Sequence, residues 1–377
     1  MLGTRERALE ALLKRGRLRS LEPRRGIDFA SNDYLGLAQS QALRDAAAAA
    51  LERGVPLGSG GSRLLRGNHT EHEALEAEAA NFFRSETALF FGGGFVANTA
   101  IFSTLPARGD LIVYDELIHA SAHEGMRLSK AESVSARHND PQSVDDAITA
   151  WRGKGGVGQP WIAVECLYSM DGDRAPLDAL IAIADAHDGM LVIDEAHATG
   201  VFGPDGRGFG AHLEGRTNVI SLHTCGKALG VMGALVLAPR SIRDFLVNRA
   251  KPFIYATAPS PLVAATVRAA IEILQREPER REALHQRIAI AGSILAAKTN
   301  HVVSGSQIQP IIVGSDTRAV ALADALKVRG YDIRAIRPPT VPEGTARLRL
   351  TITLNTSEAE LAALIDNIAQ AEAGLAV

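Results

Sequence analysis

Short apolar runs alternate with helix-like segments between about residues 70 and 240, and this feature most restricts how the chain can fold. In the intervening segments, apolar residues recur at three- and four-residue intervals, as amphipathic helices require. Such alternation predicts an α/β fold in which a mostly parallel sheet is covered on both faces. The seven expected strands are Thr87–Phe91, Gly109–Asp115, Ser133–His138, Pro160–Cys166, Gly189–His197, Asn218–Thr224 and Gly233–Ala238.

The pattern changes after Pro259, where two helical stretches are followed by strands and helices in a different order. A chain of 377 residues is long enough for one large domain and a smaller companion. We expect an N-terminal helical arm and linker over residues 1–45, a large cofactor-binding domain over 46–260 and a small α+β domain over 261–377.

Composition excludes several classes of partner. Forty basic against 43 acidic residues give a formal charge of −3, and no basic block resembles a nucleic-acid footprint. Cys166 and Cys225 offer neither a disulfide framework nor a zinc-type spacing, so no metal is expected. No apolar run reaches membrane-spanning length, and the N-terminal stretch carries charges where a signal peptide is apolar. A cytoplasmic protein that acts on small molecules is the expectation.

The residues that close each apolar run are the candidates for a binding site, because open parallel sheets bind ligands beyond the carboxyl ends of their strands. The run "LFFGGGFVANTA" joins a strand to a helix start, so backbone N–H groups at Gly94 and Phe95 can converge on a phosphate. A tight turn without a ligand is the alternative. Asp194 of "LVIDEAHATG" ends another strand, with His197 three residues on, and His119 lies at an expected helix start facing the same crevice.

Lys227 of "HTCGKALG" lies between two runs that are expected to be buried strands. A desolvated amine is costly to keep charged, which points to a reactive lysine. On these eight residues alone, a surface lysine in an ordinary strand-turn-strand connection is the better fit, so the rest of the chain must decide. A phosphate cradle that includes Thr224, a buried acid for a ring nitrogen, an aromatic ring to stack and a reactive lysine together suit pyridoxal phosphate.

With these residues in place, the sequence resembles the α-oxoamine synthases, a family of fold-type I pyridoxal phosphate enzymes. The match runs nearly end to end and is carried by "FASNDYLGLA", "GSGGSRLLRGNHTEHEALE", "SMDGDRAPL", "DEAHATGVFG", "HTCGKALG" and "AIRPPTVPEGTARLRLT". The resemblance implies a fold-type I transferase and a C-acyltransferase activity, the decarboxylative condensation of an amino acid with an acyl thioester. L-alanine and a pimeloyl thioester, on coenzyme A or acyl carrier protein, are the expected substrates, in biotin biosynthesis. Sister activities with glycine or serine are the alternative.

The resemblance also implies a role for each matching residue. Lys227 would bond to the cofactor's aldehyde, Asp194 would bind its ring nitrogen and His197 its ring hydroxyl. His119 would stack on the ring, so Lys227, His119 and Asp194 are the expected catalytic residues. The full set of expected cofactor contacts is Gly94, Phe95, His119, Ser169, Asp194, His197, Thr224, Lys227 and Thr257. The expected substrate contacts are Arg19, Asn32, His119, Thr340 and Arg349.

The resemblance further implies a homodimer with shared sites, in which Thr257 reaches the phosphate in the neighbouring subunit's site. Two features depart from the family pattern. His223 stands where many members have a small residue, and the segment between the N-terminal helix and "FASNDYLG" is shorter than usual. The second departure bears on Arg19, which lies in that segment.

Two other functions are compatible with isolated motifs. "GGGFVA" fits the dinucleotide fingerprint of an NAD-dependent oxidoreductase, with Asp115 about 20 residues on as the ribose-binding acid. That reading leaves Lys227, Asp194 and His197 unexplained. "DEAH" is also a helicase motif, but the chain has no G-x-x-x-x-G-K-[ST] segment for ATP.

Overall fold

A computed structural model describes residues 2–375, and the chain divides into two compact units. The large unit comprises Leu35–Ser169 and Arg174–Arg281. The small unit comprises the described residues up to Tyr34, the short segment Met170–Asp173, and the described residues from Glu282 on.

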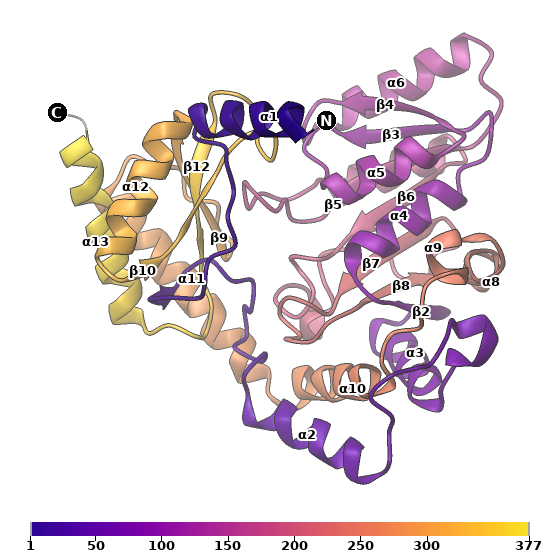
Figure 1. Ribbon diagram of the computed structural model, residues 1–377. Coiled ribbons are helices and arrows are strands. Elements are labelled where there is room, and N and C mark those ends of the chain that lie inside the picture. Colours follow the sequence, from indigo (N-terminus) through magenta and orange to yellow (C-terminus); the bar gives the residue numbers. More distant parts are fainter. Residues whose placement is uncertain (1, 376–377) are drawn as a thin grey trace. The chain divides into compact units, whose positions relative to one another are not determined.

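A seven-stranded sheet forms the centre of the large unit, in the order β2-β8-β7-β6-β5-β3-β4 (Figure 1). Strand β8 is antiparallel to both of its neighbours, whereas the other pairs are parallel. The seven strands and the α/β fold class expected from the sequence are therefore confirmed. Their bounds are β2 Thr87–Phe91, β3 Leu111–Asp115, β4 Glu132–Ala136, β5 Pro160–Glu165, β6 Met190–Asp194, β7 Val219–Thr224 and β8 Ala234–Ala238.

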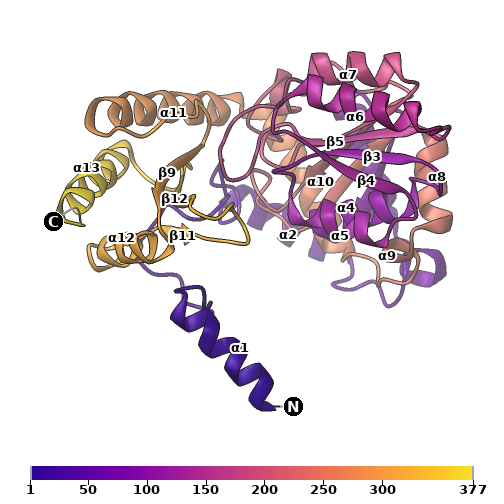
Figure 2. The same cartoon turned by 90° about the horizontal axis from the view of Figure 1, so that it is seen from above.

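Helices cover both faces of this sheet. Figure 2 shows α6 and α7 on one face and α4 and α5 on the other. Local sequence explains where several of them begin: Asp140 accepts a hydrogen bond from the Ser143 N–H and precedes Pro141, a favourable pair at a helix start. The helices of the large unit are α2 Gln41–Glu52, α3 Thr70–Phe83, α4 Gly94–Thr104, α5 Ala120–Leu128, α6 Pro141–Gly153, α7 Leu177–Ala186, α8 Arg240–Arg249, α9 Lys251–Ile254 and α10 Pro261–Arg276, with a π-helical turn η1 Arg63–Gly67 and a 3₁₀ turn η2 Pro204–Gly206.

The core of the large unit lies between the sheet and the α4–α5 face. Ile101 and Phe102 of α4 pack with Ile112, Val192 and Ile220 from three different strands, and all five are buried. Full burial of each such side chain stabilises the fold by about 1.5–3 kcal/mol. This packing fixes the carboxyl ends of the strands, where the candidate site lies.

The small unit contains a three-stranded antiparallel sheet in the order β11-β12-β9, on which α12 packs, with α13 against α12. A second, two-stranded sheet pairs β1 with β10 in parallel, which the sequence pattern did not predict. The elements are α1 Leu2–Lys14, β1 Ile27–Asp28, β9 Ile308–Gly314, α12 Asp316–Val328, β10 Tyr331–Asp332, β11 Arg334–Ile336, β12 Ala346–Thr351 and α13 Glu358–Leu375, together with most of α11 Pro278–Lys298.

Helix α1 confirms the expected N-terminal helix, and its side chains from Thr4 on are exposed. Over residues 2–375, no helix is both long and apolar enough to cross a bilayer. The cytoplasmic location stays a prediction.

Candidate functional site

Lys227 lies in the turn between β7 and β8 and is half-buried. Its Nζ is 2.7 Å from Nε2 of His197, which lies in the turn that follows β6 and is buried. Because β6 and β7 are parallel neighbours, both turns leave the same edge of the sheet. The structure thus brings together two of the residues expected to contact the cofactor.

Asp194 ends strand β6 and is buried. Its Oδ1 accepts a hydrogen bond from the Ala196 N–H at 2.9 Å, and its Oδ2 accepts one from Asn98 Nδ2 at 2.7 Å. Hydrogen bonds donated to a carboxylate favour its charged form. The site therefore holds a fixed negative charge where a protonated ring nitrogen could pair with it.

Asn98 is a site residue that sequence reasoning missed. It is buried in α4 one turn after Gly94, and it also donates to Ser121 Oγ at 2.9 Å. An amide in an otherwise apolar helix segment, "GFVANTAIF", was the available signal. Asn98 links Asp194 to the start of α5.

His119 caps the N-terminus of α5, as the sequence predicts. Its Nδ1 accepts the Ser121 N–H at 3.2 Å and lies 2.8 Å from Ser121 Oγ. With Nδ1 as the acceptor, the neutral ring carries its proton on Nε2. Burial, and then the positive charge of Lys227, lowers the pKa of His119 below its usual 6.5 despite the opposing charge of Asp194. The ring is therefore neutral at pH 7 and suited to stacking.

The expected phosphate cradle lies at the N-terminus of α4. The 11-residue helix starts at Gly94, directly after the strand β2 and two glycines. A Cβ built on Gly94 would meet the Thr224 side chain at 3.7 Å, so these two expected contacts are adjacent. A Cβ on Gly92 or Gly93 would meet nothing within 4 Å, which leaves open space beside the helix start. Backbone N–H groups and the helix dipole favour an anion there.

The remaining expected cofactor contacts differ from one another in how exposed they are. Phe95 is half-exposed in the first turn of α4, and Ser169 is buried after β5 with its N–H donated to Glu165 Oε2 at 3.1 Å. Thr257 is exposed in the loop that follows α9. Thr257 would need to reach a second chain to fulfil the expected role.

Glu165 is a second residue that sequence reasoning missed. It ends β5 directly beside Asp194 in the sheet register and is fully buried. Burial, together with the negative charge of Asp194, raises the pKa of Glu165 to about 8. At neutral pH the Glu165 carboxyl group is thus mostly protonated.

This raised pKa predicts a pH-dependent stability of the cofactor-free protein. Between its ordinary value of 4.5 and about 8, folded Glu165 holds a proton that the unfolded chain releases. The contribution of this proton to the free energy of unfolding is fully present below the ordinary pKa of Glu165. It is lost as the pH rises from that pKa to the raised one, by up to about 1.4 kcal/mol per pH unit. Glu165→Gln should remove this pH dependence of the free energy of unfolding, measured by denaturant unfolding between pH 5 and 8, whereas the exposed control Glu52→Gln should keep it. Parallel curves for Glu165→Gln and the wild type would contradict the assignment.

In the small unit, Arg349 of β12 is buried and held by several oxygens. Its Nη1 donates to Asn32 Oδ1 at 2.8 Å and to Thr351 Oγ1 at 3.0 Å, and its Nη2 lies 3.4 Å from the Tyr34 hydroxyl. The structure therefore joins two expected substrate contacts, Arg349 and Asn32, which lie 317 positions apart. A guanidinium fixed in this way can bind a carboxylate in a defined orientation.

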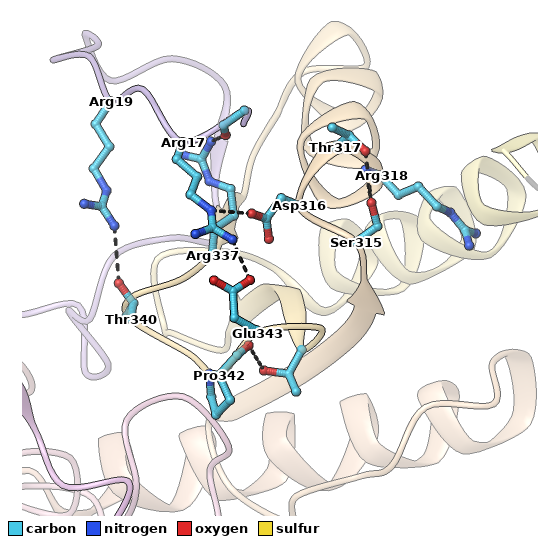
Figure 3. A network of polar contacts seen from close by, with 12 residues as sticks. Arg17, Arg19, Ser315, Asp316, Thr317, Arg318, Arg337, Thr340, Pro342 and Glu343 are labelled. Carbon is cyan, nitrogen blue, oxygen red and sulfur yellow. Dashed lines mark hydrogen bonds and ion pairs between the residues drawn. The ribbon is translucent and has the colours of Figure 1, made fainter. Parts of the chain in front are cut away.

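Two further expected substrate contacts, Arg19 and Thr340, meet elsewhere in the small unit (Figure 3). Arg19 Nη2 donates to Thr340 Oγ1 at 3.4 Å. Neighbouring Arg17 is bound by Asp316 and Glu343, each at 2.6 Å, so its charge is matched within the protein. A cavity of about 530 Å³ opens here, and its lining residues are Leu9, Leu12, Arg15, Arg17, Leu18, Arg19, Pro338, Pro339, Val341 and Glu343.

The donor set of the large unit fits pyridoxal phosphate. It offers an amine at Lys227, a hydrogen-bonded carboxylate at Asp194, a neutral ring at His119 and a helix N-terminus at Gly94 with open space beside the two preceding glycines. The acid expected for an NAD ribose is otherwise engaged: Asp115 binds the His138 ring at 2.9 Å and the Asn139 N–H at 2.8 Å. The geometry therefore favours pyridoxal phosphate over NAD.

Comparison with known proteins agrees with this site. The model of the aminotransferase class I and II family matches residues 24–368, and the chain belongs to that family. An 8-amino-7-oxononanoate synthase from Chromobacterium violaceum is 42% identical over 350 residues, which cover 92% of this chain and 89% of that protein. These findings confirm the resemblance drawn from the sequence motifs.

Solved structures show the same fold. The serine palmitoyltransferase from S. paucimobilis with a bound PLP-myriocin aldimine superposes with a TM-score of 0.89 at 26% identity, covering 99% of this chain and 98% of that one. The 8-amino-7-oxononanoate synthase from Francisella tularensis has a TM-score of 0.79 at 28% identity, covering 93% and 99%. The expected fold-type I architecture is thus confirmed.

Proposed function

We propose that this protein is a pyridoxal phosphate-dependent C-acyltransferase that condenses L-alanine with a pimeloyl thioester. The products are 8-amino-7-oxononanoate, CO₂ and a free thiol, as in biotin biosynthesis. The observation that carries the proposal is the 42% identity, over nearly the whole chain, with a synthase of that name. The arrangement of Lys227, His197, Asp194 and His119 supports the same chemistry.

When bound, pyridoxal phosphate supplies an aldehyde that links reversibly to amines and a ring that accepts an electron pair. Asp194, fixed by Asn98 and the Ala196 N–H, would hold the proton of the ring nitrogen and so strengthen that acceptor. His197 would bind the ring hydroxyl, and neutral His119 would stack on the ring. Lys227 is the base that removes the α-proton of the amino acid and later returns a proton.

Arg349 binds the carboxylate of the amino acid, with Asn32 and Tyr34 fixing its guanidinium. Because this carboxylate leaves as CO₂ after the acyl group is attached, its orientation decides which bond of the α-carbon can break. Binding energy from a buried arginine is thereby used to position the reacting atoms.

The cavity beside α1 is the proposed site of the acyl chain. Its apolar lining from Leu9, Leu12 and Val341 suits methylene groups, and Arg19 offers a cation for the distal carboxylate of pimelate. Arg17 is less suited, because two carboxylates already neutralise it.

Replacing Arg19 tests this acyl site. Arg19→Ala should raise the KM for pimeloyl thioester about ten- to hundredfold, the cost of a lost charged hydrogen bond, with little effect on an uncharged chain of similar length. Steady-state kinetics with both thioesters measure the difference, and Arg5→Ala in exposed α1 is the control. Equal effects on the two chains would remove Arg19 from the site.

A second candidate function is the serine-using sister activity, which the similarity to serine palmitoyltransferase structures favours. Serine differs from alanine by one hydroxyl group, and a pocket rejects an added hydroxyl only about a hundredfold, so few substitutions separate the two amino-acid preferences. A matrix of alanine, glycine and serine against pimeloyl and palmitoyl thioesters, followed by CO₂ and thiol release, tests both. Preference for serine with a palmitoyl thioester would overturn the first proposal in favour of the second.

The proposed functional unit is a homodimer with shared sites, which the exposure of Thr257 supports. Mixed dimers of Lys227→Ala and Thr257→Ala chains should contain one site with both lesions and one with neither. Activity should therefore return on mixing two inactive or weakened variants, measured after subunit exchange. Full activity of a strictly monomeric wild-type protein at assay dilution would contradict this arrangement.

A further inference from the structure

His223 lies in β7 beside the proposed cofactor site and is completely buried. Its Nδ1 is 2.9 Å from Thr199 Oγ1, and its Nε2 is 3.1 Å from Ser221 Oγ. The Glu214 carboxylate lies 3.6 Å from Nε2, with a side chain that is only 4% exposed. The proposed function does not use this histidine.

The hydrogen-bond pattern determines which atoms carry protons. The Thr199 hydroxyl donates its one proton to the Glu195 carbonyl oxygen at 2.7 Å, so toward His223 it can only accept. The Ser221 hydroxyl donates its proton to the Glu214 carboxylate, so it too can only accept from the ring. Both ring nitrogens of His223 must therefore donate, which makes the ring an imidazolium.

The surroundings of His223 match a positive charge. Glu214 faces it from the loop before β7. Burial raises the pKa of the nearby Glu195 carboxyl, and the charge of His223 opposes that rise. Glu195 is itself buried and accepts from Cys166 Sγ at 2.8 Å and from the N–H groups of Phe209 and Gly210. The Phe83 ring packs 4.0 Å from the His223 ring, centroid to centroid. A buried cation with a carboxylate partner and full hydrogen bonding can be retained in a fold.

The network also reaches the residues that would hold the cofactor. Thr199 connects His223 to the main chain of Glu195, which lies between Asp194 and the turn that carries His197. We propose that His223 is a buried imidazolium paired with Glu214, and that it is a positioning residue for the turn from Asp194 to Thr199. The positioning role rests on the proposed function, whereas the protonation state does not.

The protonation state can be measured on the wild-type protein without cofactor. In ¹⁵N-histidine NMR spectra at pH 8, both ring nitrogens of His223 should be protonated, while His123, whose pKa is lowered by burial, should be neutral. Glu214→Gln keeps a hydrogen-bond acceptor but removes the negative charge, so the second ring proton of His223 should be lost at that pH. A neutral His223 ring in the wild type, or an unchanged imidazolium in Glu214→Gln, would overturn the ion pair.

The positioning role is tested by the absorbance of bound pyridoxal phosphate as a function of pH. His223→Asn keeps one donor for Thr199 but removes the charge, and it should shift the titration midpoint by about half a pH unit or more. Phe83→Leu, which loses packing on the same ring but no hydrogen bond, should leave the midpoint in place. Equal midpoints in His223→Asn and the wild type, or equal shifts in both variants, would refute the role. Absence of any cofactor binding would refute the proposed function instead and leave the NMR result standing.

Discussion

Lys227→Ala is expected to lower kcat by about 10³-fold or more while the protein stays folded. Lys227 is the base of the proposed reaction, and general-base and covalent catalysis by one side chain together account for factors of this size. Phosphate and ring contacts do not involve its amine, so weak cofactor binding should remain. Steady-state kinetics and a cofactor titration measure the two effects separately.

The control for this variant is Lys154→Ala, which removes an exposed loop lysine and should leave kcat unchanged. A readout independent of turnover is also available. Borohydride treatment of the wild type should fix the cofactor's mass to the peptide that contains Lys227, and Lys227→Ala should lose that mass. Near wild-type activity in Lys227→Ala would exclude the residue as the base.

Much of the fold follows from local sequence. The seven strands of the large unit, the start of α5 at His119 and the start of α4 at Gly94 all lie where apolar periodicity and glycines predict them. These features depend on neighbouring residues and on burial, both of which are visible in a sequence window. The two-residue pairing of β1 with β10 was not predicted, because it joins segments about 300 positions apart and buries little.

The missed site residues share a physical cause. Asn98 acts through a hydrogen bond to Asp194, 96 positions away, and Glu165 acquires its raised pKa from burial next to the same carboxylate. Tyr34 contacts Arg349, 315 positions away, and donates a hydrogen bond to Asn32 Oδ1. Such roles arise from sheet register and tertiary packing, which composition and spacing do not encode.

The arginines of the N-terminal segment show the same limit. Arg15, Arg17 and Arg19 are equivalent as cations in the sequence. The structure separates Arg17, which two carboxylates neutralise, from Arg19, which contacts Thr340 at the cavity. The choice of Arg19 as the acyl-chain residue therefore has a geometric basis that the motif match alone lacked.

Asp194→Asn is expected to retain the cofactor and to lower kcat by about 10²- to 10³-fold. A neutral amide cannot hold the ring nitrogen protonated, and preorganised charge contributes factors of this size where charge develops in a reaction. The substitution also brings a second amide donor next to Asn98 Nδ2, which now donates to Asp194 Oδ2 at 2.7 Å. Asn98 can relieve that conflict by turning its amide, at the cost of its hydrogen bond to Ser121 Oγ. The fold should persist, and the lost charge should dominate the effect.

Asn98→Ala separates charge from orientation. It removes one hydrogen bond to Asp194 but keeps the carboxylate and its bond from the Ala196 N–H. A lost hydrogen bond to a charged group costs about 1.5–3 kcal/mol at most, so kcat should fall by tenfold to about a hundredfold, less than in Asp194→Asn. Measuring kcat and the absorbance of the bound cofactor in both variants gives the order of the two effects. If Asn98→Ala lowered kcat more than Asp194→Asn did, the orientation of the Asp194 carboxylate rather than its charge would control the rate. Normal turnover of Asp194→Asn would show that the ring nitrogen does not bind at Asp194.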